Sequence, residues 1–188
     1  MEFEEAFKII DTCEGWTTRD ELEILFNTAK CIDSLEVIVE IGSYKGRSAS
    51  ALVLGSASVP VVPVFCIDLF DSFKNPRGDV FPGGYREIFD ANIAKTGSED
   101  LVVAIKSKAE DVVKTWKKTI GLLFIDGDHL YEECKKDFEQ WVPFVSKGGY
   151  VFIHDTGMYE GPRKVVREKL AGKKIHVMKN MTWFIKDW

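Results

Sequence analysis

A chain of 188 residues, 45% of them apolar, is long enough for one domain with a sizeable core. Its net charge of −5 and its lack of clustered Lys and Arg argue against a nucleic-acid partner. The start of the chain is acidic where a secretory signal is basic, and no apolar run approaches the ~20 residues that span a bilayer. The four cysteines form no C-x-x-C pair, which argues against a zinc site or a disulfide framework and fits a reducing cytoplasm. We therefore expect a cytoplasmic protein, and the lack of a long apolar run predicts no membrane partner.

Two amphipathic helices are predicted within residues 1–34. Residues 3–10 and 22–29 carry apolar side chains at helical spacing, and Thr18 with Glu21 forms a capping-box pattern before the second helix. Because their apolar faces exceed what is needed to cover one side of a sheet, we expect part of this surface to form a homodimer interface.

Strands alternate with helices from residue 35 onward. The predicted strands cover 37–41, 61–67, 101–105, 122–125 and 150–153, with a closing pair over 175–178 and 182–185; the predicted helices cover 48–54, 85–93, 111–116, 131–142 and 162–170. Continuous apolar strands are buried on both faces, so this alternation indicates an α/β fold with a doubly wound, mostly parallel sheet. The last two strands are joined almost directly, which predicts an antiparallel hairpin at that edge.

Ligands of such sheets bind beyond the carboxyl ends of the strands. The first strand ends in Glu40-Ile41-Gly42-Ser43-Tyr44-Lys45-Gly46, whose glycines allow a tight turn close to a ligand. The G-x-x-x-G spacing differs from G-x-G-x-x-G and therefore disfavours a nicotinamide-dependent oxidoreductase. Asp68 follows the second strand, where an acid can accept hydrogen bonds from ribose hydroxyls. The alternative interpretations are a plain turn for the glycines and a cap for Asp68.

Ionisable residues also follow the later strands. Ser107 with Glu110 forms a second capping-box pattern. Asp126, Asp128 and His129 follow the strand over 122–125, and His154 and Asp155 follow the strand over 150–153. Such groups at the ends of buried strands are costly unless they are paired or used. They are either structural caps and pairs, or they bring Asp126, His154 and Asp155 around one divalent ion or one acceptor hydroxyl.

These motifs resemble a known family. The run Glu40 to Ser48 resembles motif one of class I S-adenosylmethionine-dependent methyltransferases. Phe124-Ile125-Asp126-Gly127-Asp128-His129-x-Tyr131-Glu132, followed by Asp137, Gly148-Gly149 and His154-Asp155-Thr156, resembles the methyltransferase 24 group, which is related to catechol-type and macrocin-type O-methyltransferases. The resemblance covers the chain from about residue 14 to residue 186 and implies a Rossmann-like, seven-stranded sheet with a reversed last strand.

The resemblance also implies roles for individual residues. Gly42, Ser43 and Gly46 would hold the methionine part of S-adenosylmethionine, with Glu40 and Tyr44 also in the cofactor site; Asp68 would hold the ribose, Ala109 and Glu110 would lie near the adenine, and Asp126 would lie beside the methyl group. In metal-dependent relatives the positions of Asp126, His154 and Asp155 bind Mg²⁺. Imidazole is a poor ligand for Mg²⁺, so His154, or else His129, is a candidate for the base that takes the acceptor's proton.

We therefore expect residues 1–188 to form one methyltransferase domain, with N-terminal helices over 1–34 and a cofactor-binding and catalytic core over 35–188, that methylates a hydroxyl group of a small molecule. The segment 69–84 is either an acceptor gate or a plain surface loop; its side chains suited to an aromatic or sugar-like ligand are Phe70, Phe73, Lys74, Arg77 and Phe81. The alternatives are a hydroxylase-like relative or a non-catalytic subunit that binds S-adenosylmethionine on the same scaffold.

Overall fold

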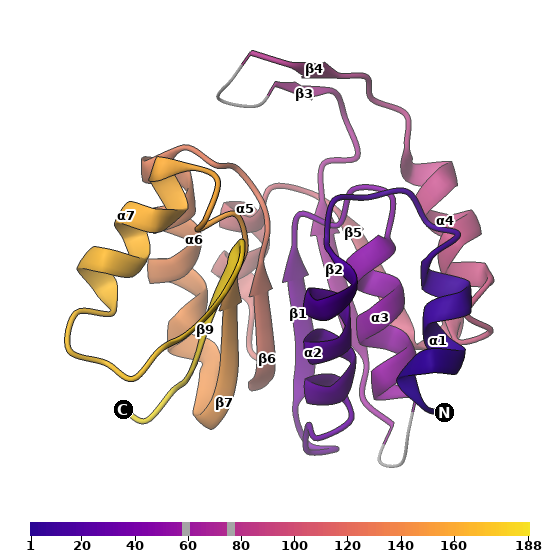
Figure 1. The fold of residues 1–188 in the computed structure, drawn as a ribbon, viewed down its shortest axis with the longest axis horizontal. Helices are drawn as coiled ribbons and strands as arrows, with labels where there is room; N and C mark the ends of the chain where they lie inside the picture. Colours follow the sequence, from indigo (N-terminus) through magenta and orange to yellow (C-terminus); the bar gives the residue numbers. More distant parts are fainter. Residues whose placement is uncertain (58–60, 75–77) are drawn as a thin grey trace.

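The computed structural model describes residues 1–57, 61–74 and 78–188 and forms one seven-stranded sheet between two layers of helices (Figure 1). The elements in chain order are α1 (Phe3–Ile10), α2 (Arg19–Ala29), β1 (Val37–Ile41), α3 (Arg47–Ser56), β2 (Val64–Asp68), β3 (Phe73–Lys74), β4 (Val80–Phe81), α4 (Arg86–Ala94), β5 (Val102–Lys106), α5 (Ala109–Val112), β6 (Ile120–Ile125), α6 (Tyr131–Trp141), β7 (Val145–Ile153), α7 (Glu160–Lys169), β8 (His176–Met178) and β9 (Met181–Ile185). Short 3₁₀ turns cover Glu99–Leu101, Val113–Thr115 and Val142–Phe144.

The strands of the sheet follow the order β5-β2-β1-β6-β7-β9-β8. The first five of these are parallel neighbours, whereas β9 runs antiparallel to both β7 and β8. The doubly wound α/β fold, the closing hairpin and the reversed last strand are thereby confirmed. The reversed strand lies inside the sheet, because β9 pairs with β7 and leaves β8 at the edge.

Several predicted boundaries differ from the structure. The strand predicted from residue 61 begins at Val64, and the one predicted from residue 150 begins at Val145, which pairs with Ile120 before a register shift. The helix predicted over 111–116 begins at Ala109 and ends as a 3₁₀ turn. The predicted Ser107 cap is wrong, since the residue before this helix is Lys108 and the Ser107 hydroxyl donates to the Lys108 carbonyl instead.

The core lies on both faces of the sheet. Helices α2, α3 and α4 cover one face, and α5, α6 and α7 cover the other (Figure 1). Strand β6, Ile-Gly-Leu-Leu-Phe-Ile in sequence, is buried along its whole length, with alternate side chains in the two layers. Burial on both faces is the physical reason that the parallel strands read as continuous apolar runs.

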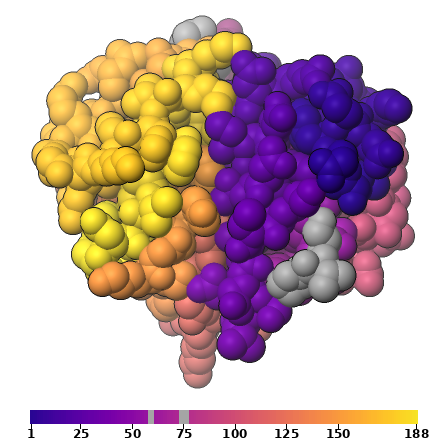
Figure 2. Space-filling view, turned by 60° about the horizontal axis from the view of Figure 1, so that its bottom comes forward, coloured from indigo at the N-terminus to yellow at the C-terminus, as the bar shows by residue number. Residues whose placement is uncertain are grey.

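The apolar faces of the N-terminal helices are covered within the chain. Phe3, Ile10, Leu22 and Phe26 form a cluster with Leu54 of α3. The argument for a dimer from uncovered helix faces is therefore wrong, and the homodimer itself stays a prediction. In space-filling view the segment that includes α2 adjoins the C-terminal hairpin (Figure 2), and Lys179 pairs with Asp20 across this boundary at 3.1 Å.

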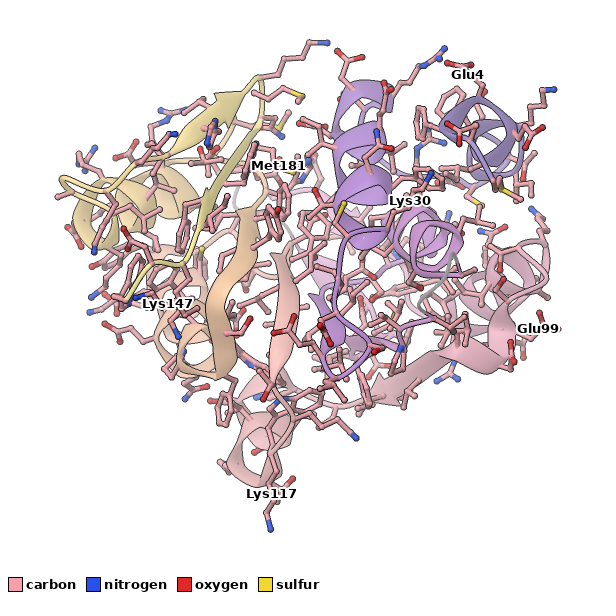
Figure 3. All side chains as sticks on the ribbon, turned by 90° about the horizontal axis from the view of Figure 1, so that it is seen from below. Glu4, Lys30, Glu99, Lys117, Lys147 and Met181 are labelled. Carbon is pink, nitrogen blue, oxygen red and sulfur yellow. The ribbon has the colours of Figure 1, made fainter. Side chains whose placement is uncertain are left out.

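Charged side chains lie at the periphery of the molecule in the view from below (Figure 3). Viewed from below the sheet, Glu99, Lys117 and Lys147 lie at the periphery (Figure 3) and are exposed. Among the described residues, no helix combines the length and apolar character needed to cross a bilayer. All four cysteines are free thiols, and Cys13, Cys66 and Cys134 are buried.

The segment between β2 and α4 rises above the carboxyl ends of the strands as the two-stranded ribbon β3–β4 (Figure 1). Phe70 does not belong to an acceptor wall, because it is buried in the core against Phe89 and Tyr85. Phe81 contacts the ring of Trp16. The side chains of Phe73 and Lys74, and the whole of Arg77, lie outside the described residues.

Candidate active site

The order of the strands brings the predicted site residues to one edge of the sheet. The carboxyl ends of β5, β2, β1, β6 and β7 follow one another there, because these strands are parallel neighbours. Three non-glycine residues at this edge have left-handed backbone conformations: Tyr44 at φ 45°, Phe70 at φ 52° and Asp155 at φ 59°. Strained backbone of this kind concentrates at functional sites.

The turn after β1 needs its glycines, as the sequence predicts. Gly42 has φ 84°, and a Cβ atom on it would lie 2.1 Å from the carbonyl oxygen of Asp126. Gly46 has φ 85°, and a Cβ atom there would lie 3.0 Å from the ring of Phe89. Gly42 is therefore required because its backbone packs closely against the backbone that follows β6. This contact places the β1 turn next to Asp126.

Asp68 organises this turn. One of its carboxylate oxygens accepts hydrogen bonds from the backbone N–H groups of Ser43 and Tyr44, both at 2.8 Å. The other accepts from the Phe70 N–H at 2.6 Å and from the Tyr85 hydroxyl at 3.1 Å. These four bonds use the acceptor capacity of a carboxylate. A ribose hydroxyl would therefore have to replace one of them.

Glu40 is a fully buried carboxylate on β1. Neither of its oxygens has a hydrogen-bond partner among the described residues, and the neighbouring hydroxyl of Ser43 has none either. Burial raises the pKa of Glu40 to about 7, although Ser43 and Ser48 nearby oppose the shift. A buried acid without partners is costly, and a bound cation would relieve that cost.

The segment between α1 and α2 covers the turn after β1. The Arg47 guanidinium donates to the carbonyl oxygens of Ile10, Cys13 and Thr17 at 3.1, 2.7 and 3.1 Å. The ring of Trp16 stacks on Tyr44 with 4.8 Å between centroids.

The two segments enclose a cavity of about 30 Å³, lined by Glu14, Gly15, Trp16, Thr17, Gly42, Ser43, Tyr44, Arg47, Ser48 and Asp126. A larger groove of about 550 Å³ lies between Phe138, Lys173 and Trp188 and contains none of the predicted site residues.

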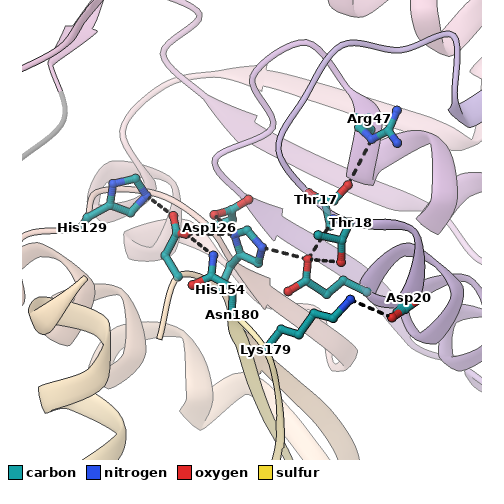
Figure 4. Close-up of polar contacts among 11 residues, drawn as sticks. Thr17, Thr18, Asp20, Arg47, Asp126, His129, His154, Lys179 and Asn180 are labelled. Carbon is teal, nitrogen blue, oxygen red and sulfur yellow. Dashed lines mark hydrogen bonds and ion pairs between the residues drawn. The ribbon is translucent and has the colours of Figure 1, made fainter. Parts of the chain in front are cut away.

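Asp126, His154 and Asp155 are brought together as predicted. Figure 4 shows Asp126 and His154 in contact. The Nδ1 atom of His154 lies 2.9 Å from Asp126 Oδ1 and 3.7 Å from Asp155 Oδ1. Its Nε2 atom faces Glu21 Oε2 at 3.5 Å. His154 is 4% exposed, so it lies behind Asp126, which lines the cavity.

His129 reaches the same cluster from the other side. Its Nε2 atom lies 2.7 Å from Asp155 Oδ2, and its ring stacks on Tyr159 with 4.3 Å between centroids. Asp155 also accepts a hydrogen bond from the side-chain amide of Asn180. Asp128 is not the cap of α6, whose N-cap residue is Leu130; its carboxylate accepts from the Leu130 N–H at 2.8 Å in the turn before the helix.

Burial and neighbouring charges shift the pKa values of the residues in this cluster. Burial raises the pKa of Asp126, although His154 opposes this. Burial alone would lower the pKa of His154, but the charge and hydrogen bond of Asp126, with Glu21 and Asp155, raise it well above the usual value. The nearby His154 ring and hydrogen bonds from Thr18 outweigh the effect of burial on Glu21 and lower its pKa. The pKa of Asp155 is lowered as well, mainly by His129.

Ala109 and Glu110 lie at the start of α5, which follows the edge strand β5. Glu110 pairs with Lys136 at 3.2 Å and with Lys108 at 3.7 Å. Ala109 packs against the core under α6 and α7. Neither residue lines the small cavity. Their position near an adenine therefore stays a prediction, supported by the place of β5 at the edge of the sheet.

The tertiary contacts of two residues in this region were not predicted from the sequence. Glu21 lies one helical turn from Leu25 on the buried face of α2, and a charged residue on an apolar face was the available signal. Arg47 stands inside the recognised motif, but its three carbonyl partners are 30 to 37 residues away in sequence, and no local pattern reports them.

Comparisons with known proteins give the family and the relatives of this chain. Residues 39–156 match the model of a family described as a methyltransferase domain, Methyltransf_24. The uncharacterized protein R132 of Acanthamoeba polyphaga mimivirus is 24% identical over 179 residues, which are 91% of this chain and 78% of that protein. The uncharacterized protein y4gI of Sinorhizobium fredii is 43% identical over 132 residues, which are 65% of this chain and only 13% of that much longer protein.

Two solved structures share the fold. The O-methyltransferase NovP has a TM-score of 0.70 at 19% identity, over 93% of this chain and 84% of that one. The O-methyltransferase TomG of Streptomyces achromogenes, involved in tomaymycin synthesis and solved with S-adenosylmethionine, has a TM-score of 0.69 at 16% identity, over 99% of this chain and 89% of that one.

Proposed function

This chain belongs to the Methyltransf_24 family of methyltransferase domains, and on that basis we propose that it uses S-adenosylmethionine to methylate a hydroxyl group of a small molecule. The observation that carries the proposal is the buried, unpartnered carboxylate of Glu40 beside the Gly42 turn. S-adenosylmethionine carries an ammonium and a sulfonium group, and a nearby carboxylate stabilises a positive charge. The hydroxyl acceptor is supported by likeness to NovP and TomG, which are O-methyltransferases.

The residues present fit this cofactor. Glu40 and Ser43 have free oxygen atoms for the ammonium end, and the turn from Gly42 to Gly46 provides the backbone beside it. The strand order supports Asp68 as the contact to the ribose, and Ala109 with Glu110 as neighbours of the adenine. Ligand pockets of this kind usually have volumes of roughly 300–1,000 Å³. The cavity of about 30 Å³ must therefore open, and the segment Glu14–Thr17 is the wall that has to move.

The chain's own residues then have two tasks at the reacting end. When bound, S-adenosylmethionine supplies an activated methyl group; the protein must align an acceptor oxygen with it and take up the hydroxyl proton. Asp126 lines the cavity, and its raised pKa makes it a better proton acceptor than an ordinary aspartate. We assign that role to Asp126, with His154 behind it; His129, paired with Asp155, is the alternative base.

Magnesium is not part of the proposal, because the residues do not fit it. The ligand atoms of Asp126, His154 and Asp155 lie within 4.8 Å of one another. Magnesium prefers an octahedral set of oxygen ligands, whereas one of these three groups is an imidazole whose Nδ1 already bonds Asp126. Asp155 is occupied by His129 and Asn180. We therefore derive no step through a metal ion.

Calorimetry with S-adenosylhomocysteine and a methyl-transfer assay over a panel of hydroxyl, amine and thiol compounds test the proposal. We expect binding, and transfer to oxygen that Asp126→Asn abolishes without loss of binding. Transfer only to nitrogen or sulfur contradicts the hydroxyl acceptor. Binding without methyl transfer to any class of acceptor favours the non-catalytic or hydroxylase-like alternatives. Binding of NADH but not of S-adenosylhomocysteine refutes S-adenosylmethionine as the cofactor.

A further inference from the structure

Glu21 of α2 is a buried acid that the proposed reaction does not use. Its side chain has no exposed surface, and it lies outside residues 39–156 that match the family model. Burying a carboxylate costs several kcal/mol unless partners compensate for lost water. A capping residue at the first turn of a helix can do its work at the surface, so capping alone does not account for this burial.

The contacts of Glu21 give it two partners. Its Oε2 atom accepts hydrogen bonds from the backbone N–H and the hydroxyl of Thr18, both at 2.8 Å. The same oxygen lies 3.5 Å from His154 Nε2, and no hydrogen bond to that nitrogen exists among the described residues (Figure 4). Glu21 is therefore tied to the start of α2 on one side and faces the imidazole ring on the other.

The ring of His154 connects Glu21 to Asp126, which lines the cavity. Its other nitrogen, Nδ1, bonds Asp126 at 2.9 Å. Asp126 is the member of the cluster that lines the cavity, with a side chain 19% exposed, whereas the side chains of His154 and Glu21 are 3% and 0% exposed. The three side chains thus form a row from α2, through the end of β7, to the end of β6.

We propose that Glu21 is a positioning residue: it holds the His154 ring in the orientation that fixes the Asp126 carboxylate at the cavity wall. This inference rests on the proposed function only in that Asp126 faces the acceptor. It gives the N-terminal helices a part in the reaction besides packing.

The test compares Glu21→Gln with Thr18→Val. Glutamine keeps the size of the side chain and an oxygen for the Thr18 N–H, but it loses the charge that faces His154. The Thr18→Val control removes the hydroxyl from the cap and leaves Glu21 facing His154. Glu21→Asp retains the charge on a shorter side chain and serves as the conservative variant.

Ring ¹⁵N signals of His154, assigned by their loss in His154→Gln, are recorded in ligand-free protein. Affinity for S-adenosylhomocysteine is measured by calorimetry, and turnover with an acceptor from the panel. In Glu21→Gln we expect shifted His154 signals and a turnover lower by about tenfold, which is the scale on which supporting partners of site residues act. The affinity for S-adenosylhomocysteine should be retained. Glu21→Asp should recover part of both changes, and Thr18→Val should lower stability while leaving ring signals and turnover unchanged.

Two results would overturn the inference. One is a set of His154 signals in Glu21→Gln that coincide with those of the wild type; the other is an equal loss of turnover in Thr18→Val, which would reduce Glu21 to a helix cap. If wild-type protein fails to bind S-adenosylhomocysteine, the proposed function fails instead. The ring signals need no ligand, so they still decide whether Glu21 orients His154.

Discussion

Replacing Glu40 by Gln should have opposite effects on stability and on cofactor binding. The carboxylate is fully buried, its oxygens have no hydrogen-bond partner among the described residues, and its pKa is raised by burial from 4.5 to about 7. Between these two pH values the folded protein holds a proton on Glu40 that the unfolded chain has released. The free energy of unfolding therefore falls as pH rises from 4.5 to 7 and stays lowered above that.

The magnitude follows from the shift. At about 1.4 kcal/mol for each pH unit, the difference between 4.5 and about 7 corresponds to about 3 kcal/mol of lost stability above pH 7. Glutamine cannot ionise, so Glu40→Gln removes this loss at pH 8 and has nothing to remove at pH 4. The unpaired amide costs about 1–3 kcal/mol, equally at both pH values. The change in unfolding free energy caused by the substitution should therefore be about 3 kcal/mol more favourable at pH 8 than at pH 4.

Urea unfolding of wild type and Glu40→Gln at pH 4, 6 and 8 measures this difference, with Glu36→Gln, just before the opposite end of the same strand, as the matched control. Calorimetry should show that Glu40→Gln weakens S-adenosylhomocysteine binding at least tenfold, as expected from losing a charged hydrogen bond to the ammonium group. An effect of Glu40→Gln on stability that is the same at all three pH values would refute the burial argument. Unchanged affinity would refute the contact between Glu40 and the cofactor.

Three further substitutions or treatments follow from the site. Arg47→Ala should destabilise the protein by about 2–4 kcal/mol, because three carbonyl groups lose a charged donor. Urea unfolding measures this loss of stability, and a change within about 0.5 kcal/mol would contradict the prediction. Gly42→Ala should lower Tm and impair cofactor binding, since the added Cβ meets the Asp126 carbonyl; a variant as stable as wild type would show that the turn can relax. Methyl transfer should be equal with and without EDTA, and recovery of lost activity by added Mg²⁺ would show that the cluster does bind the metal.

The class of fold could be predicted from the sequence because each relevant pattern is local. Apolar runs such as Leu122 to Ile125 alternate with helical periodicities, and this is what a parallel sheet covered on both faces requires. The turn glycines and the acids after the strands are adjacent to those runs in sequence. Since parallel strands end at one edge, the grouping of Asp126 with His154 and Asp155 was also within reach.

Only the tertiary structure decided how these residues are used. Asp68 turned out to bond the β1 turn, and Gly42 to fit against the Asp126 backbone, through contacts between segments 24 to 84 residues apart. Glu21 contacts His154 because α2 packs against β7, and no spacing along the chain predicts this contact. Local sequence patterns report the pairing and burial of elements, whereas the partner of a buried charge depends on how distant elements pack, which is a property of the whole fold.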